Sequence, residues 1–138
     1  MQELPIGIQD FEMLRRDNLL YVDKTARLLE LIKNGRRYFL SRPRRFGKSL
    51  TLSTLEAMFS GRVELFNGLF AESWVQERSK NPLPVLRFDI SACETGTVSL
   101  FKQSLKEMLS RFARRFNVDF HSKTISGMFQ DLDRKSVV

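Results

Sequence analysis

Residues 38–49 read Tyr38-Phe39-Leu40-Ser41-Arg42-Pro43-Arg44-Arg45-Phe46-Gly47-Lys48-Ser49, and this stretch decides the fold that the sequence predicts. It opens with a short, wholly apolar run, which is typical of a strand buried on both faces of a parallel sheet. Apolar residues at helical spacing follow the loop, and the helix they predict is expected to end near Gly61. The predicted order is therefore strand, loop, helix, with Gly-Lys-Ser at the start of the helix.

This order is the context of a phosphate-binding loop (P-loop), whose pattern is Gly, four residues, Gly-Lys, then Ser or Thr. Backbone N–H groups of such a loop surround the phosphates, and the helix start adds a partial positive charge. We expect Lys48 to reach the β- and γ-phosphates of ATP and the Ser49 hydroxyl to bind Mg²⁺. The predicted site comprises Arg42, Pro43, Arg44, Arg45, Phe46, Gly47, Lys48, Ser49 and Leu50.

The front of this loop departs from the general pattern. Arg42 stands where the first glycine would be, and Pro43 supplies no N–H, so the loop must be shaped differently there or bind more weakly at its front edge. Arg44 and Arg45 can supply compensating positive charge. The alternative interpretation is an ordinary helix start with a solvated lysine, preceded by a solvated arginine-rich surface loop.

The rest of the chain predicts alternating strands and helices, hence an α/β fold with a parallel sheet flanked by helices. Residues 84–90 are predicted as a second strand and residues 136–138 as the start of a third. Residues 63–80 are expected to form a short helix or an irregular hairpin. Four further helices are expected: one capped by Asp10 and running to Arg16, one capped by Asp23 and ending near Asn34, and two around 98–116 and 125–132.

Composition indicates a soluble globular protein of 138 residues, with 42% hydrophobic and 28% charged residues. No apolar run approaches the roughly 18 residues of a membrane span, and the first ten residues lack a signal sequence, so we expect a cytoplasmic protein without membrane contact. A single cysteine and a single histidine exclude an intrachain disulfide and a zinc site built from several such ligands. Cys93 is interpreted as a buried or half-buried thiol and not as a nucleophile, and His121 as a surface or capping residue.

The charge balance leaves a second class of function open. Lysine and arginine number 23 against 16 acidic residues, a net charge of +7. Part of the excess lies in two clusters, Arg42, Arg44 and Arg45, then Arg111, Arg114 and Arg115. With Phe46 and Phe112 nearby, they fit a basic nucleic-acid-binding module without nucleotide chemistry. A third interpretation is a small interaction domain whose loop is vestigial.

Three stretches, residues 6–11, 21–25 and 39–50, resemble the bacterial AAA-ATPase-like family, whose members often carry a PD-(D/E)XK nuclease-like domain behind the ATPase part. An arginine-rich loop in place of the first glycine is typical of that family. The resemblance spans nearly the whole chain and is most specific in its first fifty residues. It implies a P-loop NTPase fold of the AAA type, with ATP as ligand and Mg²⁺ as cofactor. Contacts with nucleic acid would come from the nuclease-like domain, outside these residues.

The resemblance also implies a domain plan. Residues 1–138 would be a partial AAA-ATPase-like P-loop domain, with a helical lead-in over 1–36 and the start of the αβ core over 37–138. The strand beginning at Val137 would continue to the Asp-Glu pair called Walker B, so we expect an N-terminal fragment lacking that strand. Asp89 is a weaker candidate for the metal-binding carboxylate and is interpreted as a strand-end or helix-cap residue. We therefore expect ATP binding with impaired or absent hydrolysis, and the sequence does not specify an oligomeric state.

Overall fold

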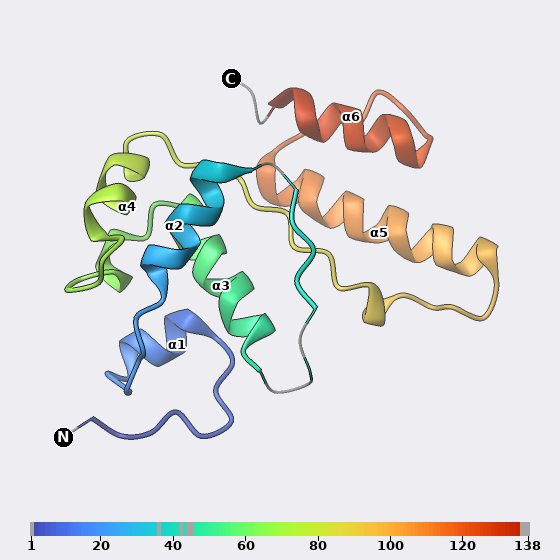
Figure 1. Cartoon of the computed structure of the whole chain (residues 1–138). Helices are drawn as coiled ribbons and strands as arrows, with labels where there is room; N and C mark the ends of the chain where they lie inside the picture. Colours follow the sequence, from blue (N-terminus) through green and yellow to red (C-terminus); the bar gives the residue numbers. More distant parts are fainter. Residues whose placement is uncertain (1, 36, 42, 44–45, 136–138) are drawn as a thin grey trace. The chain divides into compact units, whose positions relative to one another are not determined.

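The computed structural model describes residues 2–35, 37–41, 43 and 46–135, with side chains described as far as residue 133. The chain divides into two compact units, Met1–Leu83 and Pro84–Val138. The first unit contains α1 (Phe11–Arg16), α2 (Thr25–Asn34), α3 (Lys48–Phe59), the short 3-10 helix η1 (Val63–Leu65) and α4 (Glu72–Ser79) (Figure 1). The second unit contains the 3-10 helix η2 (Ile90–Ala92), α5 (Val98–Phe116) and α6 (Ile125–Lys135).

The expected helices are confirmed, because the signals that define them are local, but the N-cap of α2 is Lys24 and not Asp23 as expected. Asp10 caps α1 by accepting a hydrogen bond from the Met13 N–H at 2.9 Å. Gly35 follows the last residue of α2. The α3 helix ends at Phe59 and is followed by its C-cap Ser60. Gly61 then has φ +67°, so the helix ends near Gly61 as predicted. The region 63–80, left open between helix and hairpin, forms η1 and α4.

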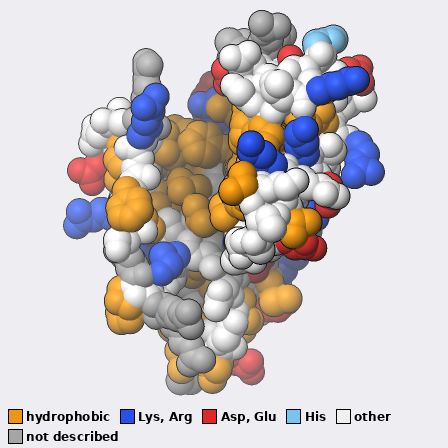
Figure 2. All heavy atoms as spheres, turned by 90° about the vertical axis from the view of Figure 1, so that its right-hand side faces the viewer, with side chains coloured by type: hydrophobic (Ala, Val, Ile, Leu, Met, Phe, Trp, Pro, Cys, Tyr) orange, Lys and Arg blue, Asp and Glu red, His pale blue; other side chains and the backbone are white. Residues whose placement is uncertain are grey.

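The expected parallel sheet is wrong for the part of the chain that the structure describes, where only helices, turns and coil occur. Tyr38, Phe39 and Leu40 are 55%, 95% and 47% exposed, so their apolar run is not a buried strand. Residues 84–89 are coil that leads into η2, and the expected strand start at 136–138 lies outside the described residues. Apolar side chains accordingly remain visible at the surface in Figure 2. An apolar run becomes a strand only when a neighbouring strand completes its hydrogen bonds.

The core of the first unit forms where α1 packs against α3 and η1. The Phe11 and Phe66 rings, both 0% exposed, lie 4.9 Å apart, and Tyr21 contacts Phe11 edge-on at 5.2 Å. The Phe11 N–H, at the start of α1, donates to the Ser53 Oγ of α3 at 3.0 Å. These contacts fix the position of α3, the helix that begins at Lys48.

A second set of contacts holds the start of α2. The Asp23 carboxylate accepts from the Thr25 N–H at 2.8 Å and, 47 residues further along the chain, from the Phe70 N–H at 2.8 Å. The buried Thr25 hydroxyl donates to the same carboxylate at 2.7 Å and accepts from the Ala71 N–H at 3.0 Å. Burial raises the pKa of the Asp23 carboxyl, but the hydrogen bonds from Phe70 and Thr25 outweigh it and bring this pKa below its ordinary value.

Asp23→Asn is expected to lower the free energy of unfolding of the first unit at pH 7 by about 1 kcal/mol after allowance for solvent screening, because an amide nitrogen cannot accept the Phe70 N–H. The pKa of Asp23 is lower in the folded state than in the unfolded state. The carboxylate therefore makes its full contribution to the free energy of unfolding above the unfolded pKa of about 3.9, and this contribution is lost as the pH falls through the lower, folded-state pKa. Urea unfolding followed by the fluorescence of Trp74, the single tryptophan, measures both effects.

The difference between parent and Asp23→Asn should therefore be constant near neutral pH and shrink below about pH 4. Asp119→Asn, in the second unit, is the control and should leave the Trp74 transition unchanged. A difference between parent and Asp23→Asn that persists undiminished at pH 3 would show that the hydrogen bonds to this carboxylate do not stabilise the fold.

The second unit is a helical hairpin in which α5 packs against α6. Leu109, Met128 and Leu132 form its buried cluster, and the Phe88 and Phe112 rings lie 4.9 Å apart beside it. The interpretation of Cys93 is confirmed, since it is a buried thiol 3.5 Å from the Met108 sulfur of α5. No helix among the described residues is long and apolar enough to cross a lipid bilayer.

Candidate functional site

The candidate site is the start of α3, where Gly47 turns the chain into the helix. Gly47 has φ +76° and ψ +18°, in the left-handed region that glycine enters most readily. Among the residues that the structure describes, none other than its chain neighbours lies within 4 Å of a Cβ built on Gly47, so they leave space beside the backbone. No side chain at the cap position accepts from the first-turn N–H groups of α3, and that turn holds no acidic residue. The helix start is therefore one at which an anion can bind.

The Lys48 side chain contacts Pro43, a described residue of the loop before Gly47. The Lys48 Nζ donates to the Pro43 carbonyl oxygen at 3.3 Å, so an ammonium from the first residue of α3 lies beside the backbone five residues earlier. Ser49 and Leu50 are half-buried, whereas the Phe46 side chain is 62% exposed. The Lys48 side chain is thus directed back toward Pro43.

The structure describes only part of the site predicted from the sequence. Six of its residues are described, namely Pro43, Phe46, Gly47, Lys48, Ser49 and Leu50, and the last five run without a break into the start of α3. Arg42, Arg44 and Arg45 lie outside the described residues, so the ring of amides and guanidinium groups expected from them stays a prediction. The context is loop and helix, since residues 38–40 do not form the expected strand.

The described residues fit a nucleotide phosphate and its magnesium ion. An open, glycine-led helix start without a carboxylate suits a phosphate, and Lys48 would hold the phosphate oxygens once it leaves the Pro43 carbonyl. The Ser49 hydroxyl would hold Mg²⁺, an ion that proteins bind through one or two side chains while phosphates and water supply its other ligands. When bound, the ion would neutralise charge on the phosphates.

The residues that secure α3 were missed by sequence reasoning. Ser53 and Thr54 are buried on α3, and both hydroxyls donate to the Leu50 carbonyl, at 3.1 and 2.7 Å. Ser53 also accepts the Phe11 N–H from α1. Since these polar residues lie at positions where periodicity predicts solvent, the sequence carries no signal for their burial. Through Ser53 the second turn of α3, just after the candidate site, is hydrogen-bonded to α1.

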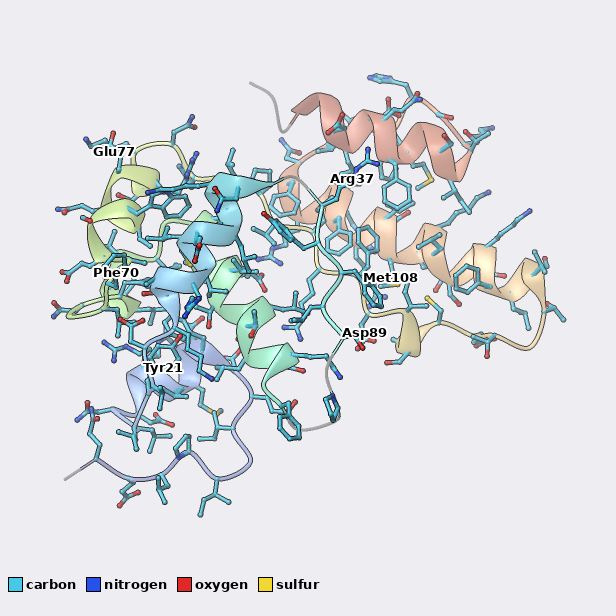
Figure 3. All side chains as sticks on the ribbon, viewed as in Figure 1. Tyr21, Arg37, Phe70, Glu77, Asp89 and Met108 are labelled. Carbon is cyan, nitrogen blue, oxygen red and sulfur yellow. The ribbon has the colours of Figure 1, made fainter. Side chains whose placement is uncertain are left out.

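Asp89 and His121 take capping or surface roles, as interpreted from the sequence. Figure 3 shows Asp89 on the coil that precedes η2, and its carboxylate accepts from the Ser91 N–H at 3.0 Å. The hydrogen bonds from Ser91 hold the pKa of Asp89 below its ordinary value. The exposed His121 donates its backbone N–H to Asp131 at 2.8 Å. Asp89 is thus engaged as a cap.

Gly47→Ala is expected to destabilise the first unit by about 1–2 kcal/mol, because a side chain at positive φ strains the backbone even where space is open. Gly47→Asn should cost less, since asparagine tolerates this conformation better. Urea unfolding followed by Trp74 fluorescence measures both variants. Equal stability of Gly47→Ala and the parent would show that the loop does not hold Gly47 at positive φ in solution.

Comparison with known proteins gives one family and one curated relative. A family model described as "Predicted AAA-ATPase" matches residues 5–137. A protein of Azotobacter chroococcum mcd 1, named as an uncharacterized protein in the vnfD 5' region, is 52% identical to this chain over 88 residues. That match covers 62% of this chain and 16% of the Azotobacter protein. No solved structure matches the chain.

Proposed function

This chain belongs to the predicted AAA-ATPase family, and from that premise we propose that it is the ATP-binding portion of a P-loop ATPase. Loop 42–49 holds the phosphates and the Ser49 hydroxyl holds Mg²⁺. The observation that carries the proposal is the position of Gly47-Lys48-Ser49 at an uncapped helix start, with Gly47 at φ +76° and Lys48 turned toward Pro43. The arginines of the loop add positive charge for the same ligand.

The binding role of each residue follows from its chemistry. The Lys48 ammonium pairs with the negative charge of the terminal phosphates, and the backbone N–H groups at the start of α3 donate hydrogen bonds to phosphate oxygens. Ser49 orients the ion against the phosphates. We propose little turnover by these 138 residues, because hydrolysis needs a carboxylate that holds the magnesium ion and orients the attacking water. Asp89, considered from the sequence as a metal-binding carboxylate, is engaged in capping η2.

The test is calorimetric titration of the 138-residue chain with ATP in the presence of Mg²⁺ and in its absence, together with phosphate release. Binding that strengthens with Mg²⁺, loses this Mg²⁺ effect in Ser49→Ala and yields little phosphate is the expected result. Failure to bind ATP would overturn the proposal. ATPase activity that survives both Lys48→Ala and Ser49→Ala would show that the chemistry occurs elsewhere.

A further inference from the structure

The exposed face of α5 carries a concentration of positive charge that the nucleotide site does not use. The helix has five basic residues and a single acidic one. Residues four apart on a helix are neighbours, and on this face they form two adjacent rows. One row is Lys102, Lys106, Ser110 and Arg114; the other is Gln103, Glu107, Arg111 and Arg115. All five basic side chains are exposed.

The two rows meet at a shallow hollow in the surface. It is lined by Glu107, Ser110, Arg111 and Arg114, so two guanidinium groups and a hydroxyl face the same depression. The Ser110 hydroxyl donates to the Lys106 carbonyl at 2.9 Å, and Glu107 accepts from the Gln103 amide at 3.3 Å. Because the Ser110 hydroxyl already donates its hydrogen, the donors that the hollow offers to an anionic ligand are the guanidinium groups of Arg111 and Arg114, and the Glu107 carboxylate would repel that ligand.

We propose that this face of α5, from Lys102 to Arg114, binds the sugar-phosphate backbone of a nucleic acid. The row spans about 18 Å, with about 6 Å between successive positions. A ligand that reaches all of it must carry repeated negative charges along an extended line. Guanidinium groups bind phosphate through paired hydrogen bonds, and lysines bind it as point charges. The contact is with phosphates, so it does not read base sequence.

An anionic membrane fits this face less well, because a helix lying in a membrane surface inserts an apolar side. The apolar side of α5 is already used: Leu109 is 0% exposed and packs with Met128 and Leu132 of α6. Insertion would require the hairpin to open. A nucleic acid needs only the polar face and leaves this packing intact.

The experiment measures binding of a fluorescein-labelled 20-mer duplex of mixed sequence to the 138-residue chain between 50 and 200 mM salt. The variant Lys102→Gln/Lys106→Gln/Arg114→Gln removes three charges from α5. The matched control, Lys24→Gln/Arg27→Gln/Lys33→Gln, removes two lysines and one arginine from exposed positions at α2. Circular dichroism checks that both variants keep their helix content.

The expected result is a shallower salt dependence in the α5 variant. Three lost phosphate contacts reduce the log–log slope by about 2.7, so the parent should lose about 40-fold more affinity than the variant across this salt range. The α2 variant should keep the parent slope. Glu107→Gln should tighten binding several-fold, because it removes the opposing carboxylate, whereas Glu30→Gln on α2 should change it much less.

Three outcomes would overturn the proposal: no duplex binding by the parent, equal losses in the two triple variants, or tighter binding to phosphatidylserine vesicles than to the duplex. Equal losses would mean that net charge alone attracts the polyanion. Lys48→Ala separates this proposal from the nucleotide site. It should weaken ATP binding by about 10- to 100-fold while the duplex affinity stays unchanged, so either proposal can fail without the other.

Discussion

Lys48→Ala should weaken Mg²⁺-dependent ATP binding by about 10- to 100-fold, the largest functional effect expected from a single substitution in this chain. A charge-assisted hydrogen bond to phosphate contributes about 1.5–3 kcal/mol, and Lys48 is the charge at the helix start where the phosphates would bind. Calorimetric titration of parent and variant with ATP measures the ratio of the two dissociation constants.

The matched control is Lys33→Ala, which removes an exposed lysine from the last turn of α2. It changes the net charge equally and should leave ATP binding within about twofold of the parent, since an exposed charge away from the ligand is screened by salt. Equal losses in Lys33→Ala and Lys48→Ala would assign ATP binding to net charge. Unchanged binding in Lys48→Ala would place the site elsewhere.

The helices were predictable from the sequence because their signals are local. Asp10 and Thr97 each cap a helix through a residue three positions later, and Gly61 supplies the positive φ that ends α3. Each signal lies within a few residues of the helix end it defines. Apolar residues that recur every three or four positions likewise predicted where α5 and α6 lie in the sequence.

The strands were not predictable, because a strand is defined by its partner. The run at residues 38–40 has the composition of a buried strand, yet Phe39 is 95% exposed. Tyr38 donates its hydroxyl to the Leu31 carbonyl of α2 at 2.6 Å, a side-chain contact that secondary-structure patterns do not encode. Apolar composition showed that these residues favour burial, but it did not show what would cover them.

In the candidate site, too, local features were predictable from the sequence and long-range contacts were not. Gly47, Lys48 and Ser49 follow from the motif, and Gly47 has the positive φ that explains the choice of glycine. The hydrogen bond from the Phe11 N–H to the Ser53 hydroxyl joins residues 42 positions apart, and no sequence pattern at either position predicts it. Local chemistry of the loop was therefore visible in the sequence, whereas the long-range contacts that hold its helix were not.

Phe66→Ala should destabilise the first unit by about 3–5 kcal/mol, the largest effect on stability expected here. The ring is 0% exposed and packs at 4.9 Å against Phe11, itself fully buried at the start of α1. Truncation removes the buried area and leaves a cavity where α1, α3 and η1 meet. Domains of this size are stabilised by roughly 5–15 kcal/mol, so the loss is a large share of the total. Urea unfolding followed by Trp74 fluorescence, with Trp74 located in α4, reports this unit selectively.

Phe70→Ala is the matched control, because this phenylalanine is four residues away and 68% exposed. Its backbone N–H, which donates to Asp23, is retained in the variant, so the change should stay within about 0.5 kcal/mol. Since the Phe11 N–H bonds to Ser53 one turn after Ser49, loosening the core under α1 should also weaken ATP binding in Phe66→Ala even below its unfolding transition. Parent-like stability of Phe66→Ala would mean that the packing of α1 on η1 does not hold this unit together.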